Sequence, residues 1–218
     1  MLPFDADALF AAFAQQNRAL WPAPAVVFVL TLGTVALAVR PRSWSAKLIG
    51  IALAVGWLWV AVGWHFLILA GLNFMAPLYA AAFLAEAVLL AWATWSGRLA
   101  FRFRHDPCGW VGLALAMVAV AGYPWLDRFA GQDWAAVRIA GLASCPIALL
   151  TIGLLLLSDG RKSLLLLLIP VLWTLVAGAT GWSLGISHDA ILPLASIAAI
   201  SVILWGSHRR VSAPGEGK

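Results

Sequence analysis

LIGIALAVGWLWVAVGWHFLILAGL, residues 48–72, is the stretch that decides the fold of this chain. It contains no Asp, Glu, Lys or Arg, and His65 is its only side chain that titrates near neutral pH. A helix of about 20 apolar residues is long enough to cross the hydrocarbon core of a bilayer. The stretch therefore predicts a membrane-spanning helix.

The composition of the whole chain agrees with this interpretation. Of the 218 residues, 63% are hydrophobic and 11% are charged, whereas a soluble domain is about half apolar and a quarter charged. The net charge of +5 is expected for loops beside anionic lipid headgroups, so we do not interpret it as a nucleic-acid signal. Two cysteines, Cys108 and Cys145, make no disulfide framework.

Similar apolar segments recur along the chain and predict an all-α membrane protein of about seven transmembrane helices. We divide it into an interfacial segment (1–20), a membrane domain (21–206) and a tail (207–218). In the first segment, apolar residues at helical spacing predict an amphipathic helix with Asp5 at its start, although a frayed arm is an equal alternative. The seven predicted spans are 21–39, 48–72, 77–96, 109–126, 137–157, 163–182 and 190–206.

The charges in the loops predict the orientation. Eleven of the fourteen basic residues fall in one set of loops, and the opposite set holds Arg18, Arg128 and Arg138 with five aspartates. Because cytoplasmic loops are rich in Lys and Arg, we expect the N-terminus outside and the C-terminus in the cytoplasm. Tryptophans at the predicted outer ends of the spans form an aromatic belt: Trp21, Trp125, Trp134 and Trp182.

Few polar side chains fall inside the predicted spans, and they mark where chemistry could occur. His65, Glu86 and Cys145 lie at similar depth below the predicted outer face. Pro146 leaves the carbonyl of Leu142 free for another partner. Weaker polar groups could join from the same side: Asn73, Tyr79, Tyr123, Ser144, His188 and Asp189.

Two interpretations of these residues stay open. In one, His65, Glu86, Cys145, Asn73, Tyr79 and Asp189 surround an outward-facing pocket for a small molecule or a proton. In the other, His65 and Glu86 only satisfy each other inside the protein. Both predict that the two side chains face inward, within reach of a direct or water-bridged hydrogen bond.

The sequence holds no signature of a cofactor, a metal site or an enzyme. His105 and Cys108 offer two ligands three residues apart, and two ligands do not make a zinc site. We therefore expect no cofactor, no metal and no catalytic residues. Intramembrane chemistry needs more polar side chains than the predicted spans contain.

The predicted partners are lipids and other membrane proteins. We expect five arginines to lie near anionic headgroups on the cytoplasmic side, although their charges could serve only to set the topology. A homo- or hetero-oligomer within the membrane is compatible with the sequence. The five residues are Arg40, Arg42, Arg98, Arg102 and Arg104.

Several short motifs follow one another along the chain: Leu2-Pro-Phe, Trp21-Pro, Trp57-Leu-Trp59, His65, Asn73, the basic loop 98–104, Cys145-Pro146 and the run Gly153-Leu-Leu-Leu-Leu. In the order of these motifs, the chain resembles an uncharacterised, domain-of-unknown-function family of bacterial multi-pass membrane proteins. The resemblance implies a location in the bacterial inner membrane and implies no activity. Because the predicted spans are continuously apolar and hold few polar groups, we expect a non-catalytic accessory or structural subunit. A small transporter, channel or ligand sensor is the alternative, and a membrane enzyme comes third.

Overall fold

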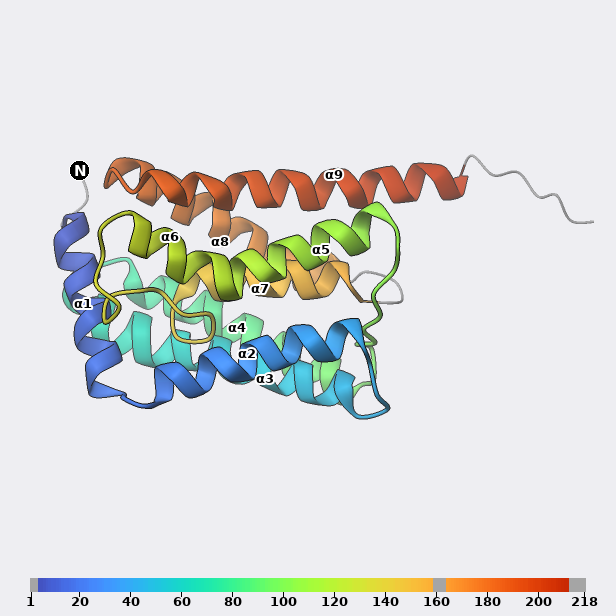
Figure 1. Ribbon diagram of the computed structural model, residues 1–218, viewed down its shortest axis with the longest axis horizontal. Helices are drawn as coiled ribbons and strands as arrows, with labels where there is room; N and C mark the ends of the chain where they lie inside the picture. Colours follow the sequence, from blue (N-terminus) through green and yellow to red (C-terminus); the bar gives the residue numbers. More distant parts are fainter. Residues whose placement is uncertain (1–3, 159–163, 212–218) are drawn as a thin grey trace, which may run out of the picture.

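The computed structural model describes residues 4–158 and 164–211, with side chains for residues 4–158 and 165–205. Those residues form helices that run side by side, and one helix that crosses their end (Figure 1). The first half comprises α1 (Ala6–Ala19), α2 (Ala23–Val39), α3 (Ser45–Trp59), η1 (Val60–Ile68), η2 (Leu69–Gly71) and α4 (Ala76–Trp95). The second half comprises α5 (Pro107–Met117), η3 (Val118–Gly122), α6 (Tyr123–Phe129), α7 (Ser144–Leu156), α8 (Leu164–Ser183), η4 (Ser187–Ala190) and α9 (Ile191–Val211).

Five of the helical stretches are long and apolar enough to cross a membrane. They are Ser45–Gly71, Ala76–Trp95, Pro107–Phe129, Leu165–Ser183 and Ser187–Trp205, and a sixth is added if the bent pair α1–α2 counts as one span. The sequence predicted about seven. The difference lies in α7, which has 13 residues, and in α2, which has 17 and meets α1 at an angle of 94°.

The predicted helix at 137–157 is helical only from Ser144 onward. Gly141 has φ +95°, a conformation that interrupts a right-handed helix and suits glycine. Upstream of it, the backbone N–H of Arg138 donates to the Asp127 carboxylate rather than to a carbonyl one helical turn back. The predicted span is therefore an irregular segment followed by a short helix.

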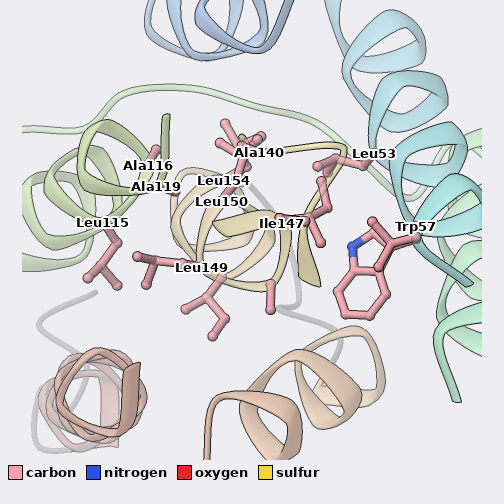
Figure 2. Packing of buried hydrophobic residues seen from close by; sticks show 14 of the residues in the cluster. Leu53, Trp57, Leu115, Ala116, Ala119, Ala140, Ile147, Leu149, Leu150 and Leu154 are labelled. Atoms are coloured by element: carbon pink, nitrogen blue, oxygen red, sulfur yellow. The ribbon is translucent and has the colours of Figure 1, made fainter. Parts of the chain in front are cut away.

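α7 forms the centre of the bundle. Every residue of α7 except Cys145 is buried, so protein encloses the helix. Its length therefore does not have to match the thickness of a bilayer. Figure 2 shows Leu149, Leu150 and Leu154 of α7 among side chains of α5, η3 and α3. Trp57 of α3 donates its indole N–H to the Thr151 hydroxyl over 2.8 Å.

Small residues allow α5 to approach α7 closely. A Cβ atom built on Gly153 would lie 2.6 Å from the backbone nitrogen of Ala116 and 2.7 Å from the carbonyl oxygen of Gly112. Gly112 and Ala116 are one of the small-residue pairs at four-residue spacing in this sequence. Such pairs let helix backbones approach within a membrane, where lipid supplies no hydrophobic drive for association.

α1 is the amphipathic helix that the sequence predicted. Asp5 caps it by accepting a hydrogen bond from the Ala8 amide over 2.8 Å. α1 lies across one end of the bundle, drawn in blue at the left of Figure 1. Its apolar face is buried there, and the Phe13 ring stacks on Trp64 with centroids 3.8 Å apart. We call this the α1 end.

The opposite end carries the basic loops. The α2–α3 and α4–α5 connections lie there, at the right of Figure 1. The predicted tail begins within α9, which continues to Val211. Arg161, Lys162 and residues 212–218, which also entered the charge count, lie outside the described residues.

Candidate functional site

The candidate site is a cluster of polar side chains buried at the α1 end, and Arg138 is its centre. We call Tyr123, Asp127, Arg138, His188 and Asp189 the polar cluster. The Arg138 side chain is 1% exposed although it lies on the irregular segment between α6 and α7. Non-helical backbone inside a membrane protein is tolerated when protein surrounds it and its polar groups are paired.

Asp127 of α6 binds Arg138 through both its oxygens. The Arg138 Nη2 and Nε atoms lie 2.6 and 3.1 Å from Oδ1, and Nε also lies 3.1 Å from Oδ2. The backbone N–H of Arg138 donates to Oδ2 over 2.8 Å. Asp127 is fully buried, so the arginine is the group that compensates its charge. A pair of this kind is strong when every donor and acceptor is satisfied.

Asp189 completes the pairing from the start of the last helical span. It accepts from Arg138 Nη1 over 2.9 Å and from the Tyr123 hydroxyl over 2.8 Å. Gly181 of α8 leaves room for it, because a Cβ atom on Gly181 would lie 2.5 Å from the Asp189 Cβ. Side chains from α6 and η4 therefore meet the irregular segment at the Arg138 guanidinium.

His188 adds a proton-dependent contact. Its Nε2 atom lies 2.8 Å from Asp127 Oδ1 and 2.7 Å from Arg138 Nη2. One ring nitrogen cannot donate to the carboxylate and accept from the guanidinium at the same time. The proton on Nε2 therefore decides which of the two neighbours His188 pairs with.

The charges of the polar cluster do not cancel when His188 is neutral. Two carboxylates and one guanidinium leave a net charge of −1, and a protonated His188 would bring the sum to zero. Burial lowers the pKa of the Arg138 guanidinium, but Asp189, Tyr123 and Asp127 outweigh burial and hold that pKa well above its usual value. Arg138 is thus a fixed cation.

α1 holds the irregular segment in place through two amides. The Gln16 side chain donates to the Leu142 carbonyl over 3.2 Å, the carbonyl that we expected Pro146 to leave free. The Asn17 side chain donates to the carbonyls of Ala135 and Val137 over 2.8 and 2.9 Å. α1 is therefore bonded to the same segment that carries Arg138.

A small cavity of about 50 Å³ lies between the polar cluster and α1. We call it the end cavity. Leu9 and Phe13 of α1 form one wall, and Arg138 contributes to another. Four of the six residues predicted to surround a pocket line this cavity: Asn73, Tyr79, Cys145 and Asp189.

The other two predicted residues, His65 and Glu86, are fully buried outside the end cavity's lining. Among the described residues neither has a hydrogen-bond partner, so the direct bond between them is absent; the water-bridged version stays a prediction. Phe83, one turn before Glu86, packs edge-on against the His65 ring at 4.6 Å and fills the space beside it. The His65 ring also contacts Tyr79 and Trp173, which line the cavity.

The predicted headgroup arginines lie at the opposite end, where four of the five are exposed: Arg40, Arg42, Arg98 and Arg102. Arg98 covers the Trp92 ring at 4.0 Å. Arg104 is half-buried in a salt bridge of 3.0 Å to Asp106. Phe101, which lies in the same basic loop 98–104, is buried.

Arg138 and Asp127 were not predicted as site residues, because their positions in the sequence are those of loop charges. One signal was available, because Arg138 lies inside the span predicted at 137–157, and a charged residue inside a span is a pointer to function. Across the residues that the structure describes, no group of three or more His, Cys, Asp or Glu side chains could hold a metal ion.

These features define an all-helical protein with several helices long and apolar enough to cross a membrane, and a buried ionic cluster at one end of its bundle. The chain belongs to DUF6064, a family of unknown function, whose model matches residues 6–213. Comparison with curated proteins and with solved structures gives no significant match.

Proposed function

We propose that this protein is a non-catalytic protein of the bacterial inner membrane that binds a small polar molecule or a proton in the end cavity. The observation that carries the proposal is the cavity itself, where polar residues from four helical elements and one irregular segment meet beneath α1. Such convergence of polar groups in a concave site is typical of ligand binding. A sensor or a small transporter would use the site in this way.

The lining of the cavity holds one charge of each sign, Arg138 and Asp189, and the buried Asp127 behind Arg138 shifts the balance of the surroundings in favour of a cation. The polar cluster carries a net charge of −1 when His188 is neutral. Trp64, Tyr79 and Trp173 line the same space, and aromatic faces attract ammonium groups. A small organic ammonium ion in the cavity would offset the excess charge, and so would a proton on His188, which lies outside the lining and contacts the cavity-lining Arg138.

α1 would control entry. It covers the cavity with Phe13 and joins α2 through a bend of 94°. Movement about that bend would open the cavity, and it would separate Phe13 from Trp64 and break the bonds of Gln16 and Asn17 to the irregular segment. The closed cavity of about 50 Å³ would then be one of two states.

Cys145 supplies the test, because it lines the cavity and is half-buried. In a Cys108→Ala background, we expect a cationic thiol reagent added from the α1 side to label Cys145 faster than an anionic reagent of equal size, after correction for their rates with a free thiol. Tetramethylammonium should slow the labelling. Phe13→Ala should speed it, and Phe129→Ala, which changes an exposed ring, should not.

Because the thiolate is the reacting form, an inert Cys145 would count against an accessible cavity if it persists in the Phe13→Ala protein, where solvent should reach the thiol. Equal corrected rates for both reagents would exclude the charge preference. Either result would favour the second candidate, an accessory subunit.

A second candidate is supported by the outward faces of α4 and α8. Both present rows of exposed large apolar side chains, which could contact a partner helix as well as lipid. A partner that copurifies in fixed ratio in mild detergent, and is lost when Leu84 and Val88 are replaced by Trp, would support this role. The exposed residues in question are Leu78, Leu84, Val88, Leu168, Leu172 and Leu175.

A further inference from the structure

A second hollow, separate from the end cavity, opens on the side of the bundle at the α1 end. It lies between the α1–α2 corner and α6, and the irregular segment at Val137 and Ile139 forms its floor. Its volume is about 900 Å³ and its lining is almost entirely apolar. We call it the lateral groove.

Three tryptophans stand at the groove. Trp21, Trp125 and Trp134 line it and are 71%, 50% and 55% exposed. Trp125 and Trp134 meet edge to face with centroids 5.1 Å apart. Tryptophan prefers the level of the lipid headgroups, so the apolar part of the groove below these rings lies at the depth of acyl chains.

One cation lines the groove. Arg18, in the last turn of α1, is exposed. Among the described residues no salt bridge or hydrogen bond engages its guanidinium. Asp133, though close in sequence to Trp134, does not line the groove. The charge of the groove is therefore positive at its polar rim.

We propose that the lateral groove is a binding site for an anionic phospholipid of the leaflet at the α1 end. The phosphate would pair with Arg18, the glycerol region would lie among the tryptophans, and an acyl chain would follow Phe28 and Ala121 into the apolar part. The groove sits beside Asn17, which is bonded to the carbonyls of Ala135 and Val137. Lipid in the groove therefore packs directly against the segment that carries Arg138.

Native mass spectrometry of the full chain, released from nanodiscs of phosphatidylglycerol and phosphatidylcholine, tests this site. We expect retained phosphatidylglycerol to exceed phosphatidylcholine, and Arg18→Gln to weaken its retention about five-fold, the effect of one cation near a membrane surface. Arg128→Gln is the matched control, because Arg128 is exposed at the same end and does not line the groove.

Blocking the apolar part gives an independent measurement. Ala25→Trp should fill the groove and reduce retention with Arg18 intact, whereas Val26→Trp, at the neighbouring exposed position outside the groove, should not. Lipid bound at the opposite basic end contributes equally to all four variants and cancels in the comparison. Equal retention in all four variants, or equal loss in each variant and its control, would overturn the proposal.

Discussion

At the scale of single residues, the buried charges divide into paired and unpaired groups, and the pairing predicts what each contributes to stability. Arg138 and Asp127 form a compact ion pair away from solvent. Removing one member of such a pair strands the other in an apolar interior, at a cost of about 3–5 kcal/mol. The Glu86 carboxyl has no partner among the described residues.

We expect Arg138→Gln to destabilise the protein by about 3–5 kcal/mol, because Asp127 and Asp189 would both lose their cation. The midpoint of thermal unfolding in detergent measures this. Arg128→Gln, at an exposed position, should leave the midpoint within error. Equal midpoints for the two variants would show that the polar cluster is not a structural element.

Replacing a buried carboxyl group by its amide should destabilise the protein far more at Asp127 than at Glu86. Glu86→Gln breaks no hydrogen bond of the described residues, so we expect it to destabilise the protein less than the same change at Asp127. Asp127→Asn weakens several bonds to Arg138 and His188 and should cost about 3–5 kcal/mol. A Glu86→Gln protein that fails to fold would reveal a partner of that carboxyl.

At the scale of secondary-structure elements, the close contact between α5 and α7 sets the tolerance for added atoms. Gly153→Ala would place a methyl group against the backbone of Gly112 and Ala116, and we expect the overpacking to cost about 1–3 kcal/mol. Gly33→Ala in α2 meets no atom within 4 Å. It should stabilise α2 by up to about 1 kcal/mol, because alanine favours helix.

Thermal unfolding of the two alanine variants in one detergent makes this comparison. A Gly153→Ala midpoint at or above that of Gly33→Ala would mean that α5 and α7 are not in backbone contact.

The helix α7 shows how much of the fold could be predicted from sequence. The apolar segment 137–157 predicted a membrane-spanning helix, and its later part is the short buried helix α7. Its start was predicted at 137, seven residues too early, because hydropathy counts Val137, Ile139 and Leu142 as spanning residues. Hydropathy is blind to Gly141 at positive φ and to the bonds of Arg138, which form only when α6 and the start of the last span come together.

The candidate site could likewise be predicted only in part. Depth along each helix follows from counting residues, so four of the six predicted pocket residues line one cavity. Which side chain faces which depends on rotation about each helix axis, and here two π-helical stretches intervene. η1 carries His65, and η3 directly precedes Tyr123; each shifts the phase of the side chains that follow it. The contacts of His65 with Phe83 and Trp173 were therefore beyond prediction from periodicity.

At the scale of the whole molecule, the distribution of charge predicts how the bundle sits in a membrane. The loops at the end opposite α1 expose Arg40, Arg42, Lys47, Arg98 and Arg102. The α1 end exposes Arg18 and Arg128 with Asp5, Asp7 and Asp133, while its remaining arginine, Arg138, is neutralised inside the polar cluster. Burial of Arg138 therefore leaves two exposed arginines at the α1 end, where the count from sequence gave three basic residues, and the orientation rule depends on Lys and Arg rather than on net charge.

We expect the end opposite α1 to face the cytoplasm, because basic loops are retained on that side. A green fluorescent protein fused after Lys218 should fluoresce, and an alkaline phosphatase fused at the same point should be inactive. A phosphatase fused within the α6–α7 segment after Gly131, which has φ +93° and is exposed at the α1 end, should be active. Strong phosphatase activity at Lys218 would invert the orientation, and with it the leaflet from which the lateral groove draws its lipid and the side from which the end cavity opens.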